Sequence, residues 1–600
     1  MLATYTWPRY AYRRARELGT ATPRRVPLVI VGAGPVGLAA AIDAAQRGLQ
    51  VIVLDDDNTV SIGSRGVCYA KRTLEIFDRL GLGDRVVAKG VTWNVGRTFH
   101  GEREVFSFNL LPEAGHQRPG MVNLQQYHLE QYLVERAMAL PLIDLRWLHK
   151  CVAISPGNDG VQLEIETADG RYALHADWLI AADGARSGIR RQMGLDVEGQ
   201  VFQDRFLIAD ILLDGEPFPI EKTERRFWFA PKFHAGESAL MHRQADNVWR
   251  VDFQLGWDAD PQSTEREKDP ERVRARVRAM LASQGFGHIG FELEWLSVYT
   301  FQCRRMARFR HGRVLFVGDS AHQVSPFGAR GANSGVQDAD NLVWKLKLVI
   351  DGAAPASLLD SYDQERGAAA DENILNSTRS TEFMTPKSRV ARVLRQAVLS
   401  LADELPAGRA LVNSGRLSVP TVLADSPLNT PDAEAFEGWM VPGAPLDDAP
   451  LHDAAGHETW LLPHTGQGFV LLHFGLPGAI EAAALDAMAA DRVPVQPLLV
   501  LSAGQHAPAG RAAAIDHDGL AARRYDARPG TCYLIRPDQH VAARWRKFDA
   551  AAVRAALARA TQGVPAGARP AARRANTPQC AARRLPDERA GPPQAPYRSA

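Results

Sequence analysis

Residues 26–200 carry short apolar runs that alternate with longer stretches of helical periodicity. The runs LVIV at 28–31 and VIVL at 51–54 are typical of buried strands, and the stretch between them, which extends to Gly48, has the apolar spacing of an amphipathic helix. The same strand-then-helix order returns in residues 301–400. Strands that alternate with helices favour an α/β fold built on a parallel sheet.

Residues 201–300 show a different pattern, in which apolar and polar positions alternate with the period of a strand. The segments FLIADILL, RRFWFA, SALMHR and VWRVDFQL predict an antiparallel sheet. One helix is expected to interrupt it, from the capping acid Asp269 to Gln284. A second α/β pattern covers residues 440–550. Residues 561–600 are rich in Ala, Pro and Arg and hold almost no large apolar side chain, which predicts a disordered tail.

With 46% hydrophobic and 23% charged residues among 600, the chain has the composition of a globular protein with a sizeable core. Its net charge of +1 gives no basis for a nucleic-acid or membrane partner held by bulk charge. The five cysteines stand far apart and include no CxxC pair, which argues against a disulfide framework, a dithiol centre and a metal site. The reducing cytoplasm is therefore the expected location.

Residues 1–25 are rich in arginine and in aromatic side chains, among them Trp7, Tyr10 and Tyr12, but they contain no apolar core of a signal peptide. An arginine-rich start is compatible with a transit peptide. We favour the alternative, in which these residues form an arm that packs across the protein's own surface.

The segment Gly32-Ala-Gly34-Pro-Val-Gly37 matches the GxGxxG pattern of dinucleotide-binding turns. The pattern alone is weak, because residues 285–290 match it as well. The second match follows a helix and precedes a strand, so no helix N-terminus points at a phosphate, and we interpret it as a turn. The first match joins a strand to an apolar helix, where the glycines allow a tight turn, close approach of a pyrophosphate and close helix packing.

Asp55 ends the strand that follows this helix, at the place where an acid accepts hydrogen bonds from ribose hydroxyls. Asp56 and Asp57 are the alternative for this role, although a short acidic cluster is often only a solvated loop. We favour Asp55 because of its register after the strand. Together these features predict a bound dinucleotide without saying which one.

Two further segments place polar residues after strands. In LIAADGARSGIR a strand runs into Asp183-Gly184, and in RVLFVGDSAH a strand ends at Asp319, followed by the glycine-rich PFGARGANSG around Gly331. These are DG and GD motifs, and they follow the GxGxxG motif in this order within residues 26–400. On these motifs the chain resembles the group A flavoprotein aromatic hydroxylases, which have the p-hydroxybenzoate hydroxylase-like fold.

The resemblance implies a resident FAD and roles for several residues. Arg65 resembles the arginine that family members set against the flavin, although Gly66 stands where many relatives have alanine. Gln126 resembles their glutamine near the FAD pyrophosphate and ribityl chain. Asp319 is expected to bind ribityl hydroxyls. Pro326 resembles the family proline whose carbonyl neighbours the reacting hydroxyl.

A helix is predicted to begin after Gly331, and its first N–H groups, around Ala332 and Asn333, can point at the pyrimidine edge of the flavin. Such donors stabilise the negative charge that reduced flavin carries there. An ordinary loop–helix join would leave the glycines of this segment unexplained. His322 follows the GD turn, where it can shuttle protons or hold the loop by bonding to the backbone, and we favour the second role.

The layout most resembles the larger phenolic hydroxylases of the 3-(3-hydroxyphenyl)propionate hydroxylase and phenol hydroxylase types, which implies a thioredoxin-like domain after the catalytic part. Since this domain lacks CxxC, we assign it packing or homodimer contacts. The predicted fold is α/β, with a Rossmann-like FAD-binding domain, an inserted antiparallel-sheet substrate domain and a C-terminal thioredoxin-like domain. Its expected parts are an arm (1–25), the discontinuous FAD-binding domain (26–200 and 301–400), the substrate domain (201–300), a connector (401–439), the thioredoxin-like domain (440–560) and the tail (561–600).

The resemblance implies a single-component, FAD-dependent monooxygenase. NADPH or NADH, bound transiently near Asp183-Gly184, reduces the flavin, O2 adds to its C4a carbon, and the hydroperoxide hydroxylates a small phenolic or aromatic substrate. Another FAD-dependent dehydrogenase or oxidase on the same fold is an alternative, and so is a non-catalytic FAD- or ligand-binding protein. The intact motif residues argue against the last of these.

The substrate is expected between the flavin and the sheet of residues 201–300. Strand alternation places Arg250, Asp252 and Gln254 on one face of this sheet. An arginine there can hold a substrate carboxylate, and His242 can deprotonate a phenol. The alternative, which we favour, is that this face meets solvent.

Overall fold

The predicted strands at the start of the chain form the parallel centre of a larger sheet, whose outer strands are in part antiparallel. β1 (Arg24–Val31) pairs in parallel with β2 (Val51–Asp55) on one side and with β11 (Gly170–Ala181) on the other. β11 in turn pairs in parallel with β18 (Val314–Phe316). Because these strands end at the same edge of the sheet, the segments that follow them meet there, although they are far apart in the sequence. The other strands of this sheet are β8 (Ile143–Trp147), β9 (Lys150–Pro156), β10 (Val161–Thr167) and β17 (Arg310–His311).

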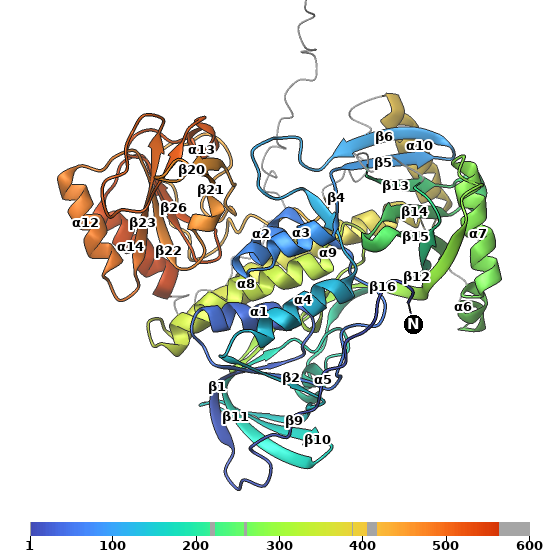
Figure 1. Cartoon of the computed structure of the whole chain (residues 1–600), viewed down its shortest axis with the longest axis horizontal. Coiled ribbons are helices and arrows are strands. Elements are labelled where there is room, and N and C mark those ends of the chain that lie inside the picture. Colours follow the sequence, from blue (N-terminus) through green and yellow to red (C-terminus); the bar gives the residue numbers. More distant parts are fainter. Residues whose placement is uncertain (1, 217–222, 257–260, 387, 405–416, 563–600) are drawn as a thin grey trace, which may run out of the picture. The chain divides into compact units, whose positions relative to one another are not determined.

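The computed structural model describes residues 2–216, 223–256, 261–386, 388–404 and 417–562 (Figure 1). Of the predicted tail, Thr561 and Gln562 belong to the last helix and the rest lies outside the described residues. Part of the predicted connector, 405–416, also lies outside them.

Helices pack on the parallel sheet. α1 (Pro35–Gln46), α4 (Gln126–Met138) and α8 (Gly331–Ile350) lie side by side (Figure 1), and the apolar residues of α1 and α8 are buried in one core with β1, β2 and β11. Further helices of the chain up to residue 404 are α2 (Lys71–Arg79), α3 (Gly83–Lys89), α5 (Gly188–Gln192), α9 (Asp360–Met384) and α10 (Arg389–Glu404). Of these, α10 packs on the second large sheet. A small sheet joins β3 (Cys68–Ala70), β7 (Met121–Asn123) and β4 (Val91–Trp93).

The second large sheet differs from the prediction in two respects. It contains the predicted strands β12 (Glu198–Leu213), β13 (Glu224–Phe229), β14 (Ser238–Arg243) and β15 (Val248–Gly256), and also β16 (Phe291–Arg305) and β19 (His322–Gln323). However, β5 (Val95–His100) and β6 (Arg103–Asn109) extend it, and β5 pairs with β13 in parallel. The sheet is therefore not wholly antiparallel and not confined to residues 201–300, because a hairpin from the preceding segment completes its edge.

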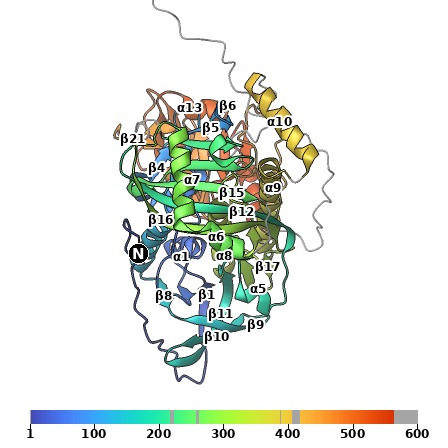
Figure 2. The same ribbon diagram turned by 90° about the vertical axis from the view of Figure 1, so that its right-hand side faces the viewer.

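The apolar face of this sheet is covered by α7 (Pro270–Ser283), as Figure 2 shows. Asp269 caps the helix by accepting a hydrogen bond from Arg272 N–H at 3.0 Å. Val273 and Val277 of α7 are buried with Trp249 of β15. A second helix, α6 (Pro261–Glu267), precedes it, so the segment between the strands holds two helices rather than the one predicted. The opposite face of the sheet is turned toward the first part of the chain.

Residues 445–562 contain a third large sheet and its own apolar cores. Its strands, in spatial order, are β21 (Glu458–Trp460), β20 (Pro450–His452), β24 (Ala513–Asp516), β23 (Val495–Ser502), β22 (Phe469–Phe474), β25 (Cys532–Ile535) and β26 (Val541–Trp545). β22, β23 and β24 are parallel, whereas β25 and β26 run antiparallel to their neighbours. Its helices are α12 (Ala479–Ala489), α13 (Leu520–Arg524) and α14 (Ala550–Gln562).

A buried ionic network joins this third part to α8 and α9. Glu365 of α9 accepts hydrogen bonds from Lys345 of α8 at 2.6 Å and from Arg536, after β25, at 2.6 and 3.0 Å. Arg536 also donates to Asp538 at 2.6 Å, and all four side chains are fully buried. Loss of one of these side chains would leave an uncompensated charge in the interior, so single substitutions in this network are expected to be costly.

None of the helices in the described residues has the length and apolar character needed to cross a membrane.

Candidate active site

The first glycine turn has the shape of a phosphate cradle. Gly32 has a φ of +109°, and a Cβ there would lie 2.3 Å from the carbonyl oxygen of Ala182. A Cβ on Gly37 would lie 2.0 Å from the carbonyl oxygen of Gly32, whereas a Cβ on Gly34 would meet no atom within 4 Å. The first and third glycines therefore allow close packing, and the second leaves open space at the N-terminus of α1. This arrangement fits a pyrophosphate.

Asp55 lies beside this turn at the end of β2. One of its carboxylate oxygens accepts a hydrogen bond from Ala33 N–H at 2.6 Å, and the other accepts one from Asp57 N–H at 2.9 Å. Burial raises the pKa of Asp55 to about 6; the two N–H donors oppose this shift, and the charges of Asp56 and Asp57 add to it. Asp56 and Asp57 are themselves exposed. Asp55 is thus the acid of this cluster that faces the turn.

The second GxGxxG match, residues 285–290, is a turn that joins α7 to β16. A Cβ on Gly287 would contact Ala282 of the preceding helix at 3.2 Å. A strand follows at Phe291, so this segment offers no helix N-terminus to a phosphate.

The predicted Asp183-Gly184 turn follows β11. One carboxylate oxygen of Asp183 accepts a hydrogen bond from Ile189 N–H at 3.0 Å, and the other is buried without a hydrogen-bond partner among the described residues. Because buried polar atoms are rarely left unpaired, that second oxygen is available to accept a hydrogen bond from a bound molecule. Arg190, which the sequence analysis missed, donates to the carbonyl of Ser320 at 2.7 Å and so ties the DG turn to the GD turn.

Asp319 lies three residues after the end of β18, in the turn Gly318–Ser320, and its side chain is exposed. Desolvation by the surrounding protein nevertheless raises the pKa of the Asp319 carboxyl. The positive charges of His322 and Arg65 oppose this shift. His322 is buried, and its Nε2 lies 2.6 Å from the carboxylate of Asp338, which also accepts a hydrogen bond from Gly318 N–H at 3.0 Å. His322 therefore holds the turn through a carboxylate rather than through the backbone bond that we expected.

Gly331, Ala332 and Asn333 form the first turn of α8, whose leading N–H groups have no acceptor within the helix itself. The side chain of Asn333 accepts a hydrogen bond from Ala70 N–H and donates one to the carbonyl of Cys68, both at 2.9 Å. These bonds fasten the helix start to β3. The helix start is thereby positioned to offer N–H groups to an anionic or carbonyl-bearing ligand edge.

Arg65 is exposed, and its loop is organised by Gln126 at the start of α4. The Gln126 side chain accepts a hydrogen bond from Gly66 N–H at 2.9 Å and donates one to Glu130 at 2.7 Å. A Cβ on Gly66 would lie only 3.3 Å from the Gln126 oxygen, which is a physical reason for glycine at this position. Both ends of the Gln126 amide thus have protein partners, and its contact with FAD stays a prediction.

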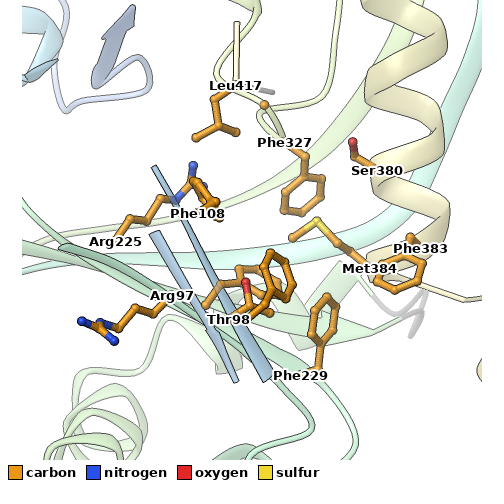
Figure 3. A pocket seen from close by; sticks show the side chains of 13 residues that line it. Arg97, Thr98, Phe108, Arg225, Phe229, Phe327, Ser380, Phe383, Met384 and Leu417 are labelled. Carbon is orange, nitrogen blue, oxygen red and sulfur yellow. The ribbon is translucent and has the colours of Figure 1, made fainter. Parts of the chain in front are cut away.

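An apolar pocket lies beside the loop that leads into α8 (Figure 3). Figure 3 shows the Arg225 side chain running in toward Phe108, whereas Arg97 points away and pairs with Glu224 at 2.6 Å. Arg225 has no hydrogen-bond or ion-pair partner in the part of the chain that the structure describes. The pocket is lined by Arg97, Thr98, Phe106, Phe108, Arg225, Phe227, Phe229, Phe327, Gly328, Ser380, Phe383, Met384 and Leu417.

Comparison with known proteins agrees with this geometry. The model of the FAD binding domain family matches residues 25–377. The chain belongs to this FAD-binding family. The match spans the glycine turn, the DG and GD motifs and the inserted sheet.

Relatives within this FAD-binding family include monooxygenases. The 6-methylpretetramide 4-monooxygenase of Streptomyces rimosus is 31% identical over 545 residues, which cover 87% of this chain and 91% of the relative. A 3-(3-hydroxy-phenyl)propionate/3-hydroxycinnamic acid hydroxylase of Mycolicibacterium gilvum is 28% identical over 529 residues, covering 86% and 89%. The crystal structure of the flavin-dependent monooxygenase PieE with FAD and substrate has a TM-score of 0.76 and 25% identity over 90% of this chain and 100% of that one. The predicted resemblance to group A flavoprotein hydroxylases, and FAD-dependent aromatic hydroxylation with it, is confirmed.

The face that carries Arg250 and Gln254 does not meet solvent, so the favoured alternative of the sequence analysis was wrong. Arg250 is 2% exposed and donates to both carboxylate oxygens of Asp210 at 2.8 Å, while Gln254 is 4% exposed and accepts from Ser238 N–H. The face is buried because it packs toward the first part of the chain, where a Cβ on Gly63 would overlap the ring of Trp295 in β16. Periodicity shows that residues share a face but not what covers that face.

His242 lies on the same buried face, and its Nδ1 is 3.2 Å from the amide nitrogen of Asn123. Burial, together with the charges of Arg225 and Arg250, holds the pKa of His242 well below its ordinary value. Its ring is therefore neutral at physiological pH. Pro326 is exposed at the loop before α8, and its carbonyl accepts a hydrogen bond from Ala329 N–H at 3.0 Å.

Arg225 is not among the site residues predicted from the sequence. The paired arginines of RRFWFA were its signal, since strand alternation sends neighbouring side chains to opposite faces. Within the described residues, no group of three or more His, Cys, Asp and Glu side chains is arranged to hold a metal ion.

Proposed function

We propose that this chain is an FAD-dependent monooxygenase that uses NADPH or NADH and O2 to hydroxylate a phenolic ring with an anionic substituent. The observation that carries the proposal is the pocket lined by phenyl side chains beside Phe327 and Gly328, with the unpartnered Arg225 of the described chain at its side. The loop at Phe327 leads directly into the first turn of α8. A ring in this pocket therefore lies next to the site that we assign to the flavin.

The residues around the glycine turn fit FAD. We assign the pyrophosphate to the open space at Gly34, the ribose hydroxyls to Asp55 and the ribityl hydroxyls to Asp319. The pyrimidine edge is assigned to the start of α8, and we place the nicotinamide near Asp183 and Gly184, where one Asp183 oxygen has no hydrogen-bond partner among the described residues. When bound there, FAD supplies the redox chemistry that activates O2.

The pocket side chains bind and orient the substrate. Phenyl rings pack against an aromatic substrate in offset or edge-to-face arrangements, and the planar guanidinium of Arg225 matches a carboxylate or an ionised phenol. Apolar walls exclude water, which strengthens that ion pair.

The test is a screen of hydroxylated aromatic acids, matched phenols without the acid group, and polycyclic phenols. We expect the purified protein to be yellow, and we expect the acids to stimulate NADPH or NADH oxidation with one atom of labelled O2 entering the ring. Stimulated oxidation with unlabelled product would indicate a dehydrogenase or oxidase instead. A colourless protein without a thermal shift on adding FAD would contradict the proposal.

Arg225→Met separates the substrate assignment from the cofactor assignment. We expect KM for the aromatic acid to rise about tenfold or more, with FAD binding unchanged, because only the substrate anion loses its partner. Arg171→Met is the matched control, since Arg171 pairs with Glu164 and Glu166 on an exposed strand. An unchanged KM in Arg225→Met would remove the anionic substituent from the proposal.

For residues 440–560 we propose a thioredoxin-like domain without redox chemistry. Parallel strands β22 and β23, the antiparallel pair β25 and β26, and the closing helix α14 support this assignment. The described cysteines are free thiols, in keeping with the cytoplasmic location that the sequence predicts. The proposed homodimer is testable by the mass of the purified protein in solution, and the proposed domain boundaries by limited proteolysis.

A further inference from the structure

The segment of residues 56–66 connects two predicted cofactor residues, Asp55 at the end of β2 and Arg65. We call it the FAD loop. It contains no helix or strand, so ladder hydrogen bonds do not hold it in place. Contacts with other parts of the chain must therefore set its conformation.

The N-terminal arm supplies such contacts. The N–H of Tyr10 donates to the carbonyl of Asn58 at 2.8 Å, and Arg9 donates to the Asn58 side chain at 2.9 Å. Thr59 donates its hydroxyl to the carbonyl of Pro8 at 2.7 Å. These bonds connect residues 8–10 of the arm to residues 58 and 59, in the first half of the FAD loop.

Trp7 extends these contacts toward the middle of the loop. Its indole N–H donates to the carbonyl of Ser61 at 3.0 Å. On its other side Ser61 donates its N–H to Glu130 of α4 at 2.5 Å, and Glu130 accepts from Gln126, which in turn accepts from Gly66 N–H. A continuous chain of hydrogen bonds therefore runs from the arm to the residue next to Arg65.

The arm is itself anchored at several places. The Tyr5 ring is buried 4.2 Å from that of Tyr127 in α4, and Thr4 donates to Glu294 of β16 at 2.6 Å. The Tyr10 ring stacks on Trp147 at 4.7 Å with an interplanar angle of 13°. Trp147 ends β8 directly opposite Asp55 in the parallel sheet. The arm is thus fastened to three elements around the loop.

We propose that residues 2–10 are a strap that holds the FAD loop in its cofactor-binding conformation, with Trp7 as a positioning residue. The inference rests on the proposed FAD site, because the loop matters for the cofactor only if Asp55 and Arg65 flank FAD. A loop ordered before binding loses less conformational entropy when the ligand arrives, so the strap increases affinity without touching the cofactor.

The test measures the dissociation constant of FAD for apoprotein prepared from the full chain. Trp7→Phe removes the N–H donor to Ser61 and keeps an aromatic ring, and we expect the FAD dissociation constant to rise about threefold. Deletion of residues 1–10 removes the whole strap, and we expect an increase of about tenfold or more. At saturating FAD both variants should keep kcat within about twofold, since neither touches the pocket.

Tyr12→Phe is the matched control within the arm. The Tyr12 hydroxyl donates to Asp169 at 2.9 Å, away from the FAD loop, so its loss should leave FAD affinity unchanged. A second readout is hydrogen exchange of the loop amides in the apoprotein, which should be faster in Trp7→Phe than in Tyr12→Phe. If the arm had only a structural role, both substitutions would lower the melting temperature. Neither the FAD dissociation constant nor the exchange of the loop amides would then differ between the two variants.

The outcomes separate the two proposals. If the wild-type apoprotein binds no FAD, the proposed function fails and the strap fails with it. If the wild type binds FAD and Trp7→Phe binds it equally well, the strap alone is overturned. The same holds if Tyr12→Phe weakens binding as much as Trp7→Phe. Because Trp7→Phe keeps the buried rings of the arm, it decides the matter even if the deletion variant does not fold.

Discussion

The proposed cofactor half and the proposed substrate half of this site are built in different ways. The cofactor half uses backbone groups and single acids at the ends of β1, β2, β11 and β18, and each of these lies in a short motif. The substrate half gathers side chains from β5, β6, β13 and α9, which are separated by up to nearly three hundred residues. Local geometry therefore governs the first half, whereas sheet pairing governs the second.

Gly37→Ala is expected to have the largest effect in the cofactor half. Its Cβ would lie 2.0 Å from a backbone carbonyl oxygen, which no rotamer change relieves, so the turn must open and FAD binding should be lost. Gly287→Ala in the second GxGxxG segment is the matched control, and it should change the free energy of unfolding by about 1 kcal/mol or less. FAD titration and thermal unfolding of both variants measure this difference. If both variants lost FAD affinity equally, the conclusion that only the first glycine turn binds the cofactor would be contradicted.

Arg250→Met and Arg225→Met compare two arginines of the substrate half. Arg250→Met leaves Asp210 buried without its partner, so we expect unfolding to become easier by about 3–5 kcal/mol. Arg225→Met leaves no buried carboxylate without an ion-pair partner. The free energy of unfolding should therefore change by about 1 kcal/mol or less, while KM for the aromatic acid rises. Denaturant unfolding measures the first effect and steady-state kinetics the second. If Arg250→Met is as stable as the wild type, the buried Arg250–Asp210 pair does not contribute to the stability of the sheet.

Asp319→Ala tests the acid at the end of β18. Hydrogen bonds to a charged group contribute about 1.5–3 kcal/mol, so we expect FAD affinity to fall about 10- to 100-fold. Asp56→Ala is the control, because Asp56 is exposed beside Asp55 and should leave FAD affinity unchanged. Wild-type affinity in Asp319→Ala would show that the GD turn is not part of the FAD site.

The smallest expected effect is the pH dependence that Asp55 confers. Because the folded-state pKa is raised to about 6, the carboxylate becomes protonated as the pH falls from 7 to 5. FAD affinity should then weaken by up to about tenfold, since the ionised fraction falls by about that factor and the charged acceptor for ribose hydroxyls is lost. Asp55→Asn should flatten this profile in an FAD titration.

The stability of the apoprotein should respond to Asp55 in the opposite direction. A carboxyl whose pKa is higher in the folded state than in the unfolded chain binds its proton more tightly when folded. Its contribution therefore favours folding increasingly as the pH falls through 6, and Asp55→Asn should remove this gain. If FAD affinity and apoprotein stability both decreased, or both increased, as the pH is lowered, the assignment of Asp55 to the FAD ribose would be contradicted.

Prediction from the sequence worked best where a motif and its conformation are local. The order β1, α1, β2 and the helix start at Gly331 follow from runs of apolar residues and from glycines that only certain turns require. The same reasoning failed for Arg250, because alternation assigns it to a face but cannot show that the first part of the chain covers this face. It also missed Arg225, whose importance depends on a parallel pairing of β13 with the distant β5.

The sequence by itself therefore determined the FAD-binding elements, since a glycine turn, a strand-end acid and a helix start are each specified within a few residues. Only the tertiary structure decided which side chains line the pocket, that Arg250 is paired with Asp210, and that Arg225 has no such partner among the described residues. It also decided that the aromatic arm reaches the FAD loop. Such arrangements depend on packing between segments that are far apart in the sequence, and no local motif specifies which of these segments come together.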